Sequence, residues 1–369
     1  MAPRKLNLVV KIGTAALGAS DGMPDAKLLG ALVAELAALK KAGHQVILVT
    51  SGAVGTGRAL TKKNKALGHC DPVAERQILA SLGQAKLITL YQDLLTRHGL
   101  LASQILLTKQ DFRTREHHKH MAHLFAALQK QPHLLPIVNE NDSVTVEELM
   151  FTDNDELAGL LAAMINADRL IILSHIAGVY DRAPDEKDAQ IIPLVDWKDK
   201  GRKAETKGKS QSGRGGMASK LSVARKMADL GIRTHIASAR EANVISRLLD
   251  DENLGTTVVP AQGKRNAVKR WLASEVNRAP ATVTANECLA EMIRKPGQTL
   301  SILPVGLVKI TGSFEKGDLV QINDEKGEAL ALGVARCDAA ALKASLGKKQ
   351  QAVFIHHDQL HRMQHDKSA

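Results

Sequence analysis

Short apolar runs alternate with helical patterns along most of the chain, and this alternation restricts the fold more than any other feature. The first apolar run is "LNLVVKIG", which is followed by "DAKLLGALVAELAALKKAG" and then by "HQVILVTSG". In the middle segment Leu28, Leu32, Leu36 and Leu39 repeat at helical spacing. The three segments therefore predict a strand, a helix and a second strand, which is the unit that builds parallel sheets.

Further runs of the same kind predict how the rest of the chain is organised. They are "LLASQILLT", "LLPIVNEND", "DRLIILSHIAGVY" and "GIRTHIASA", with helical segments between them. We therefore predict an α/β domain at residues 1–262, an open and mostly parallel sheet sandwiched by helices. A basic helical pattern that ends at Pro280 predicts a linker at 263–281. Short alternating runs with a turn at 324–327 predict a small β-barrel-like domain at 282–360, followed by a polar tail at 361–369.

Composition limits the classes of function. No segment approaches the roughly 20 apolar residues that a membrane-spanning helix needs, and the start of the chain has no signal-peptide pattern. We therefore predict a cytoplasmic protein with no membrane partner. The three cysteines are far apart, which indicates reduced thiols. The net charge of +11 favours an anionic partner, but charge alone does not distinguish a nucleic acid from a phosphorylated metabolite.

Histidines recur near the end of the chain. His357, His361 and His365 are spaced four apart, which on a helix would align three imidazoles. No cysteine or carboxylate cluster accompanies them, so the spacing favours a solvated tail over a metal site.

In an open parallel sheet, ligands bind where strands lead into helices, so these junctions predict the site. The first strand delivers Lys11 followed by a glycine. The second delivers Ser51, Gly52 and Ala53 directly before a helical pattern, where free backbone N–H groups favour an anion. A tight turn packed for steric reasons is the alternative explanation of these small residues.

Acidic and amide side chains follow another buried run. The segment "NEND" at 139–142 comes straight out of "LLPIV", which is a poor way to end a purely structural strand. Ten residues on, Asp153, Asn154 and Asp155 begin a helical pattern. N-capping accounts for one of these three residues and leaves two for chemistry.

A lysine-, glycine- and serine-rich segment leads into another predicted helix. Gly213, Gly215, Gly216 and Lys220 lie at this junction, where glycines let the backbone wrap phosphates and a lysine neutralises charge. The P-loop spacing fails here, and a flexible basic linker remains the alternative. No nucleophile is evident. Two lysines, several carboxylates and two glycine-bearing helix entrances match phosphoryl transfer, which requires mainly positioning and charge neutralisation.

Five ordered motifs resemble those of the glutamate 5-kinase family in the amino acid kinase superfamily. They are "VVKIGT", "VTSGAV", "NENDSV", "TDNDELA" and "GGMASKL", and the segment "LPVGLVKITGSFEKGDLVQI" resembles a PUA domain. The resemblance implies the amino acid kinase fold and ATP-dependent phosphorylation of the γ-carboxylate of L-glutamate, the first step of proline biosynthesis. It also implies a homo-oligomer (dimer or tetramer), feedback inhibition by proline and glutamyl phosphate reductase as a partner.

The same resemblance implies roles for individual residues. Mg²⁺ would be bridged by the ATP phosphates, with no protein ligand assigned. The implied catalytic residues are Lys11, Asp155 and Lys220; the implied glutamate-binding residues are Ser51, Gly52, Ala53, Asp142 and Asn154; and the implied ATP-binding residues are Lys11, Ser174, His175, Arg214, Gly215, Gly216, Met217, Ala218, Ser219 and Lys220.

Two departures from the family pattern fall in the nucleotide region. Ser174 and His175 stand where the family usually has Thr-Asp. Arg214 stands where the usual Gly-Thr-Gly-Gly-Met has its threonine. We therefore expect altered nucleotide affinity or preference. Three alternatives remain open: a sibling kinase with another acceptor, a catalytically impaired regulatory paralogue, and an RNA-binding protein that uses the PUA-like domain. Scarce aromatic residues weigh against base stacking in the last of these.

Overall fold

The structure is a computed structural model that describes residues 4–18, 22–64, 67–68, 70–112, 115–144, 151, 153–184, 186–196, 216–260, 281–295 and 300–363. The chain divides into two compact units, residues 1–109 with 122–264, and residues 110–121 with 265–369. Most of the predicted linker at 263–281 lies outside the described residues, and so do Gly213, Arg214 and Gly215.

Eight strands of the described residues form one sheet in the first unit, in the order β3-β4-β2-β1-β5-β7-β8-β6. Every strand pair is parallel except β7 with β8, which confirms the predicted mostly parallel sheet. The strands are β1 (Asn7–Ile12), β2 (Gln45–Val49), β3 (Leu101–Leu107), β4 (Leu134–Glu140), β5 (Arg169–Ser174), β6 (Leu194–Asp196), β7 (Arg233–Ser238) and β8 (Thr256–Val259).

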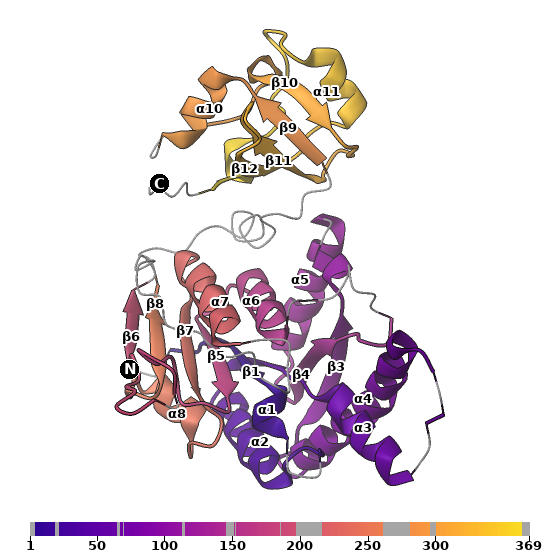
Figure 1. Cartoon of the computed structure of the whole chain (residues 1–369), viewed down its shortest axis with the longest axis vertical. Coiled ribbons are helices and arrows are strands. Elements are labelled where there is room, and N and C mark those ends of the chain that lie inside the picture. The colour runs from indigo at the N-terminus through magenta and orange to yellow at the C-terminus, as the bar shows by residue number, and fades with distance from the viewer. Residues whose placement is uncertain are drawn as a thin grey trace. The chain divides into compact units, whose positions relative to one another are not determined.

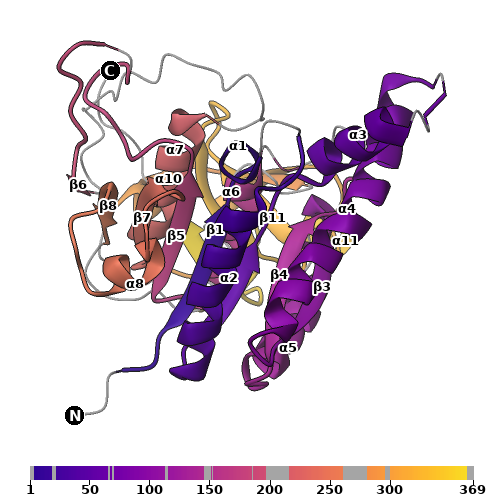
Figure 2. The same cartoon turned by 90° about the horizontal axis from the view of Figure 1, so that it is seen from below.

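Helices cover both faces of this sheet. Figures 1 and 2 show α6 and α7 on one face, with α2 and α8 on the other. The helices up to residue 249 are α1 (Thr14–Leu17), α2 (Ala26–Lys41), α3 (Ala53–Asn64), α4 (Pro72–Thr96), η1 (Lys109–Phe112), α5 (Arg115–Gln129), α6 (Asn154–Met164), α7 (Met217–Asp229) and α8 (Val244–Leu249). Among the described helices, none is both long enough and apolar enough to cross a membrane.

Local sequence patterns explain why the strands and helices of the first unit form where they do. The central strand β1 is covered on both sides, so Leu8, Val9 and Val10 are all fully buried instead of alternating. Helix α2 is capped by Asp25, whose side chain accepts the N–H groups of Lys27 and Leu28, and its leucine stripe packs into the core. The strand-helix-strand unit predicted from the first three segments is thereby confirmed.

Two glycines let α3 and α4 approach each other closely. A Cβ atom on Gly83 would lie 1.7 Å from the carbonyl oxygen of Ala53, and one on Gly57 would lie 1.9 Å from that of Leu79. No side chain fits at either position. Gly52 has a different reason, because its φ of +98° is a left-handed conformation that glycine adopts without strain. Both steric packing and a special turn therefore account for the motif "GAVGTG".

The second unit contains a sheet of five strands in the order β10-β9-β11-β12-β13. Its predicted hairpin is confirmed, because β11 and β12 pair antiparallel across the turn at 324–327. The apolar core includes Val283, Leu330 and Phe354. The elements are β9 (Ala281–Ala285), α10 (Glu287–Arg294), η3 (Pro304–Gly306), β10 (Leu307–Thr311), β11 (Leu319–Asn323), β12 (Ala329–Val334), α11 (Ala339–Ser345), η4 (His357–Gln359) and β13 (Leu360–Arg362).

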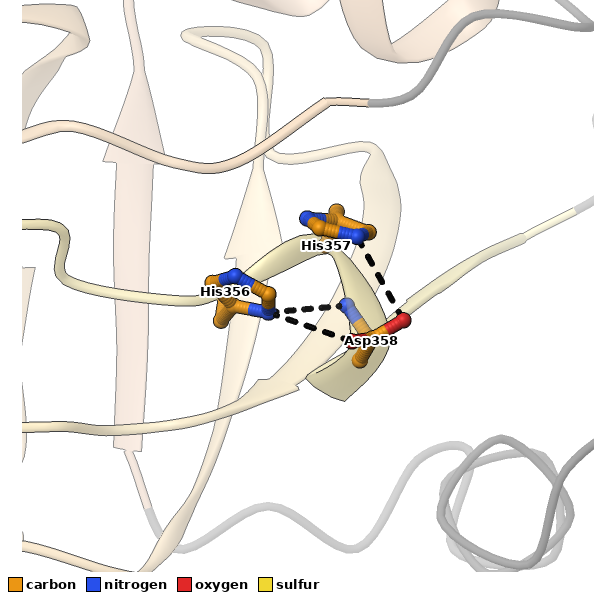
Figure 3. A group of neighbouring side chains, drawn as sticks. All are labelled: His356, His357 and Asp358. Carbon is orange, nitrogen blue, oxygen red and sulfur yellow. Dashed lines mark hydrogen bonds and ion pairs between the residues drawn. The ribbon is translucent and has the colours of Figure 1, made fainter.

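The helical alignment considered for the C-terminal histidines is wrong where the chain is described. His357 begins the short helix η4, whereas His361 belongs to β13 and pairs with Leu332, so the sheet extends into the segment predicted as a tail. A different cluster forms instead (Figure 3): His356, His357 and Asp358 bring ring nitrogens and carboxylate oxygens within 4.8 Å of one another. His365 lies outside the described residues.

Candidate functional site

A cavity of about 540 Å³ opens at the carboxyl ends of β1, β2, β4 and β5, where the sequence predicts the site. It brings together side chains from most of the motifs, although they are far apart in the sequence. The lining residues that matter below are Lys11, Ser51, Gly52, Ala53, Arg58, Arg76, Asn139, Glu140, Asp142, Asp153, Asn154, Asp155, Ser174, His175 and Lys220.

A buried carboxylate holds two lysines at the floor of this cavity. Asp155 Oδ1 lies 2.6 Å from Lys11 Nζ, and Lys220 Nζ donates to Asp155 Oδ2 at 2.9 Å. The Asp155 side chain has no exposed surface, and those of Lys11 and Lys220 are only 5% and 10% exposed. Because little water screens these charges, the ion pairs with Asp155 are strong. They hold the two ammonium groups beside each other.

Electrostatics decide the protonation of this cluster. Burial alone would raise the pKa of Asp155, but the charges of Lys11 and Lys220 hold it below its usual value. The neighbouring Asp153 has a raised pKa because it is desolvated and lies beside the negative charge of Asp155. Asp155 is therefore an anion that lies between two ammonium groups at the floor of the cavity.

The three polar residues at the start of α6 have different roles. Asp153 is the N-cap residue, and its Oδ1 accepts the N–H groups of Asp155 and Glu156 at 3.0 Å each. Its Oδ2 accepts the hydroxyl of Ser219 at 2.5 Å, which joins α6 to the first turn of α7. Asn154 and Asp155 line the cavity. The expectation that capping accounts for one of three polar residues is thus confirmed.

Asn154 links the small-residue turn to the strand β4. Its side-chain N–H group donates to Ser51 Oγ at 3.0 Å and to the Thr50 carbonyl at 2.6 Å. It also donates to Asn139 Oδ1 at 2.7 Å. The turn before α3 is thereby held against the polar end of β4, and its backbone borders the cavity at Ser51, Gly52 and Ala53.

Asp142 is paired with a residue that the sequence analysis did not single out. Arg76, near the start of α4, donates from Nη2 to Asp142 Oδ1 at 2.5 Å. Desolvation raises the pKa of Asp142, and Arg76 partly offsets this effect. The neighbouring Glu140 accepts the N–H of Phe151 at 2.9 Å, and burial together with the charge of Asp142 raises its pKa to about 7.

The predicted nucleotide-binding residues are only partly brought together. Ser174 and His175 line the same cavity, and desolvation together with the charge of Lys220 lowers the pKa of His175. Helix α7 starts after Gly216, so Met217, Ala218 and Ser219 form its first turn beside Lys220. These three residues and Gly216 do not line the cavity within the described part of the chain. Arg214 and Gly215 lie outside the described residues.

Comparisons with known proteins place the chain in a family. Residues 7–238 match the model of the amino acid kinase family, and residues 281–357 match the PUA domain. The chain is 39% identical over 357 residues to glutamate 5-kinase of Bacteroides thetaiotaomicron, covering 96% of this chain and 98% of that protein. It is 38% identical to glutamate 5-kinase of Chlorobaculum tepidum, with 96% of each covered.

The chain belongs to the amino acid kinase family. Its large parallel sheet between helices is the fold of that family, and the second sheet forms the PUA domain. Among solved structures, UMP kinase from Bacillus anthracis is similar, with a TM-score of 0.47 and 15% identity over 69% of this chain and 97% of that one.

As a member of the amino acid kinase family, the chain offers two cations to a phosphorylated ligand. The ammonium groups of Lys11 and Lys220 bind the two carboxylate oxygens of Asp155 at the floor of the cavity. The carboxylates there are already paired or hydrogen-bonded. Among the described residues, the group of three side chains spaced so that it could hold a metal ion is His356, His357 and Asp358, in the other unit.

Sequence reasoning left Arg76, Asn139 and Glu140 without a role, as it did Arg58, although all four line the cavity of this amino acid kinase. The polar end of β4 was a visible signal for Asn139 and Glu140, since polar residues rarely end a buried strand. Arg76 gave no comparable signal, because an arginine in the first turns of a helix is usually solvated. Its contact with Asp142 depends on how α4 packs.

Proposed function

We propose that the chain transfers the γ-phosphoryl group of ATP to the γ-carboxylate of L-glutamate, forming L-glutamyl 5-phosphate, the first step of proline biosynthesis. The observation that carries this proposal is the buried Lys11–Asp155–Lys220 cluster. The names of the glutamate 5-kinase relatives, which match over 96% of the chain, supply the acceptor.

The roles of the cluster follow from its charges. A γ-carboxylate oxygen attacks the γ-phosphorus in line, the bond from that phosphorus to the bridging oxygen breaks, and ADP leaves. Lys11 and Lys220 neutralise the charge that spreads over the transferring group, and Asp155 holds both ammonium groups in place. The acceptor carboxylate is already ionised near neutral pH, so the reaction needs no general base.

Other cavity residues bind and orient the two substrates. Ser51, Gly52 and Ala53 offer backbone and hydroxyl donors to the glutamate, with Asn154 fixing the turn and Asp142 facing the ammonium group. Ser174, His175 and the segment from Arg214 to Lys220 bind ATP. Mg²⁺, when bound to the ATP phosphates, neutralises part of their charge.

The test is a trapping assay with the full chain. We expect ATP, Mg²⁺ and L-glutamate to give ADP and, with hydroxylamine present, equal amounts of γ-glutamyl hydroxamate. L-Aspartate in place of L-glutamate is the matched acceptor control and should give neither product above background. ADP release without hydroxamate, or no glutamate-dependent ADP at all, would contradict the proposal and favour a sibling acceptor or RNA.

Other expectations from the sequence stay predictions. These are the homo-oligomer, inhibition by proline, a glutamyl phosphate reductase partner and a cytoplasmic location. RNA binding through the PUA domain would give an affinity that falls steeply as salt increases, which a filter-binding titration measures directly.

A further inference from the structure

Two imidazoles and a carboxylate meet at the short helix η4 of the second unit (Figure 3). One ligand atom from each of His356, His357 and Asp358 lies within 4.8 Å of the other two. The carboxylate has one oxygen near each ring: His356 Nδ1 is 3.6 Å from Asp358 Oδ2, and His357 Nε2 is 3.4 Å from Asp358 Oδ1. The proposed kinase reaction uses none of these side chains, which belong to the other unit.

The separations in this cluster are longer than those of strong hydrogen bonds. A nitrogen and an oxygen that share a proton well are about 2.7–3.2 Å apart. Two ligand atoms that each lie about 2.0–2.1 Å from a tetrahedral zinc ion are about 3.3–3.4 Å apart. The N–H of Asp358 also donates to His356 Nδ1, but at 3.4 Å this bond is weak. The three side chains are therefore spaced more like ligands around one ion than like strong partners of one another.

The backbone on both sides of the cluster is held by the core of its unit. Before the cluster, Ile355 is fully buried and exchanges backbone hydrogen bonds with Ile302. After it, Leu360 is buried at the start of β13. Within it, the N–H of His357 donates to Ser301 Oγ at 3.0 Å. Because the turn is anchored in this way, binding an ion orders less of the chain than it would in a free tail.

The cluster is accessible to an ion from solution. The side chains of His356 and His357 are 38% and 37% exposed, and that of Asp358 is 61% exposed. Two imidazole nitrogens and a carboxylate are a set that Zn²⁺ binds, with water in the remaining position. Mg²⁺ prefers oxygen ligands, so a pair of imidazoles does not select it.

We propose that His356, His357 and Asp358 bind a divalent transition-metal ion such as Zn²⁺, with one ligand atom from each side chain. The site lies in the PUA domain and is independent of the proposed function and of the Mg²⁺ assigned to the ATP phosphates. All three ligands come from one turn, so their spacing depends on the folding of η4. A bound ion therefore stabilises the folded PUA domain.

A rival set of ligands comes from the same segment. The spacing of four residues would align His357 with His361 if the segment were a helix. His361 instead belongs to β13, where it pairs with Leu332, and it is not a member of the three-residue cluster among the described residues. It is therefore the matched control, a nearby histidine outside the proposed set.

The test measures Zn²⁺ binding to the full chain in excess Mg²⁺, by competition with a chromophoric zinc chelator. The proteins are the wild type, His357→Ala, Asp358→Asn and His361→Ala; His356 is left unchanged because it also caps η4. We expect His357→Ala and Asp358→Asn each to weaken the tightest Zn²⁺ site at least about 10-fold, since even residues that only support metal ligands usually change affinity 10- to 100-fold. His361→Ala should keep the wild-type affinity.

Thermal unfolding gives a second readout of the same site. Zn²⁺ should raise the Tm of the wild type and of His361→Ala, and raise it less in His357→Ala and Asp358→Asn. Because these two variants remove different ligands, a folding defect in one leaves the other to decide.

Three results would overturn the proposal. The first is a wild type that binds no Zn²⁺ in excess Mg²⁺. The second is equal Zn²⁺ affinity in the wild type, His357→Ala and Asp358→Asn. The third is a loss in His361→Ala as large as that in His357→Ala, which would assign the ion to the aligned histidines instead.

Discussion

The ammonium of Lys220 lies 2.9 Å from the carboxylate of Asp155, and this contact joins the first turn of α7 to the first turn of α6. Lys11 approaches the other carboxylate oxygen from the end of β1. Three elements of the sheet and its helices thus meet at one buried anion. Charge at this point can stabilise a transferring phosphoryl group only while all three elements are packed together.

Loss of the Lys220 ammonium should remove transition-state stabilisation. We expect Lys220→Met to lower kcat about 100- to 1,000-fold, the usual effect of removing one charge-stabilising donor, with a small change in the KM for glutamate. Lys226→Met, on an exposed position of the same helix, is the control and should retain wild-type kcat. Steady-state ADP release measures both. Equal activity of the two variants would contradict the role of Lys220.

Alanine should have opposite effects on stability at two glycines, one in the close contact between α3 and α4 and one on α2. Gly83→Ala places a Cβ against the Ala53 carbonyl oxygen, so we expect a loss of about 1–3 kcal/mol or more in the free energy of unfolding. Gly30→Ala, within α2, meets nothing closer than 4.0 Å and should gain up to about 1 kcal/mol. Urea unfolding measures both values. A Gly83→Ala protein as stable as the wild type would show that the helices separate easily.

Asp153 should contribute through its cap and through its bond to Ser219. Asp153→Ala removes the acceptor of two helix N–H groups, which typically costs about 0.5–2 kcal/mol of stability. Ser219→Ala removes only the hydroxyl that binds Asp153 Oδ2, so its cost should be smaller. Thermal unfolding of the two variants ranks them. A Ser219→Ala variant that is destabilised as much as Asp153→Ala, or more, would contradict a capping contribution from Asp153.

The raised pKa of Glu140 predicts that the free energy of unfolding depends on pH. Its pKa in the folded chain is about 7, compared with 4.5 for the ordinary value, so the folded state binds the proton more tightly. The stabilisation from this proton is complete below about pH 4.5 and is lost as the pH rises through 7, with a slope of at most about 1.4 kcal/mol per pH unit. Glu140→Gln should flatten this part of the profile in unfolding measurements from pH 4.5 to 8. An unchanged slope would rule out Glu140 as its source.

The parallel sheet and the floor of the cavity could be predicted because they depend on local signals. Buried β-rich runs determine β1 and β2, and the carboxyl ends of parallel strands must meet at one edge, which brings Lys11 toward Asp155. The hairpin of the second unit was visible in its alternation and turn residues.

Features that depend on packing between distant segments could not be predicted in this way. The pairing of Arg76 with Asp142 depends on where α4 packs, and α4 approaches α3 closely only because Gly83 has no side chain. The divided roles of Asp153 and Asp155 became apparent only once the start of α6 was located. The strand at His361 was not predicted because three histidines spaced four residues apart suggest a helix, whereas pairing with β12 overrides that local pattern.

The most direct test of the central claim follows an oxygen atom. L-Glutamate labelled with ¹⁸O at both γ-carboxylate oxygens is incubated with the protein, ATP, Mg²⁺ and hydroxylamine, and the released phosphate is analysed by mass spectrometry. If an acyl phosphate forms, each phosphate carries one ¹⁸O and the γ-glutamyl hydroxamate keeps the other. Hydroxylamine attacks the carbonyl carbon, so the labelled bridging oxygen leaves with phosphorus. Unlabelled phosphate would show that no acyl phosphate forms and would contradict the account.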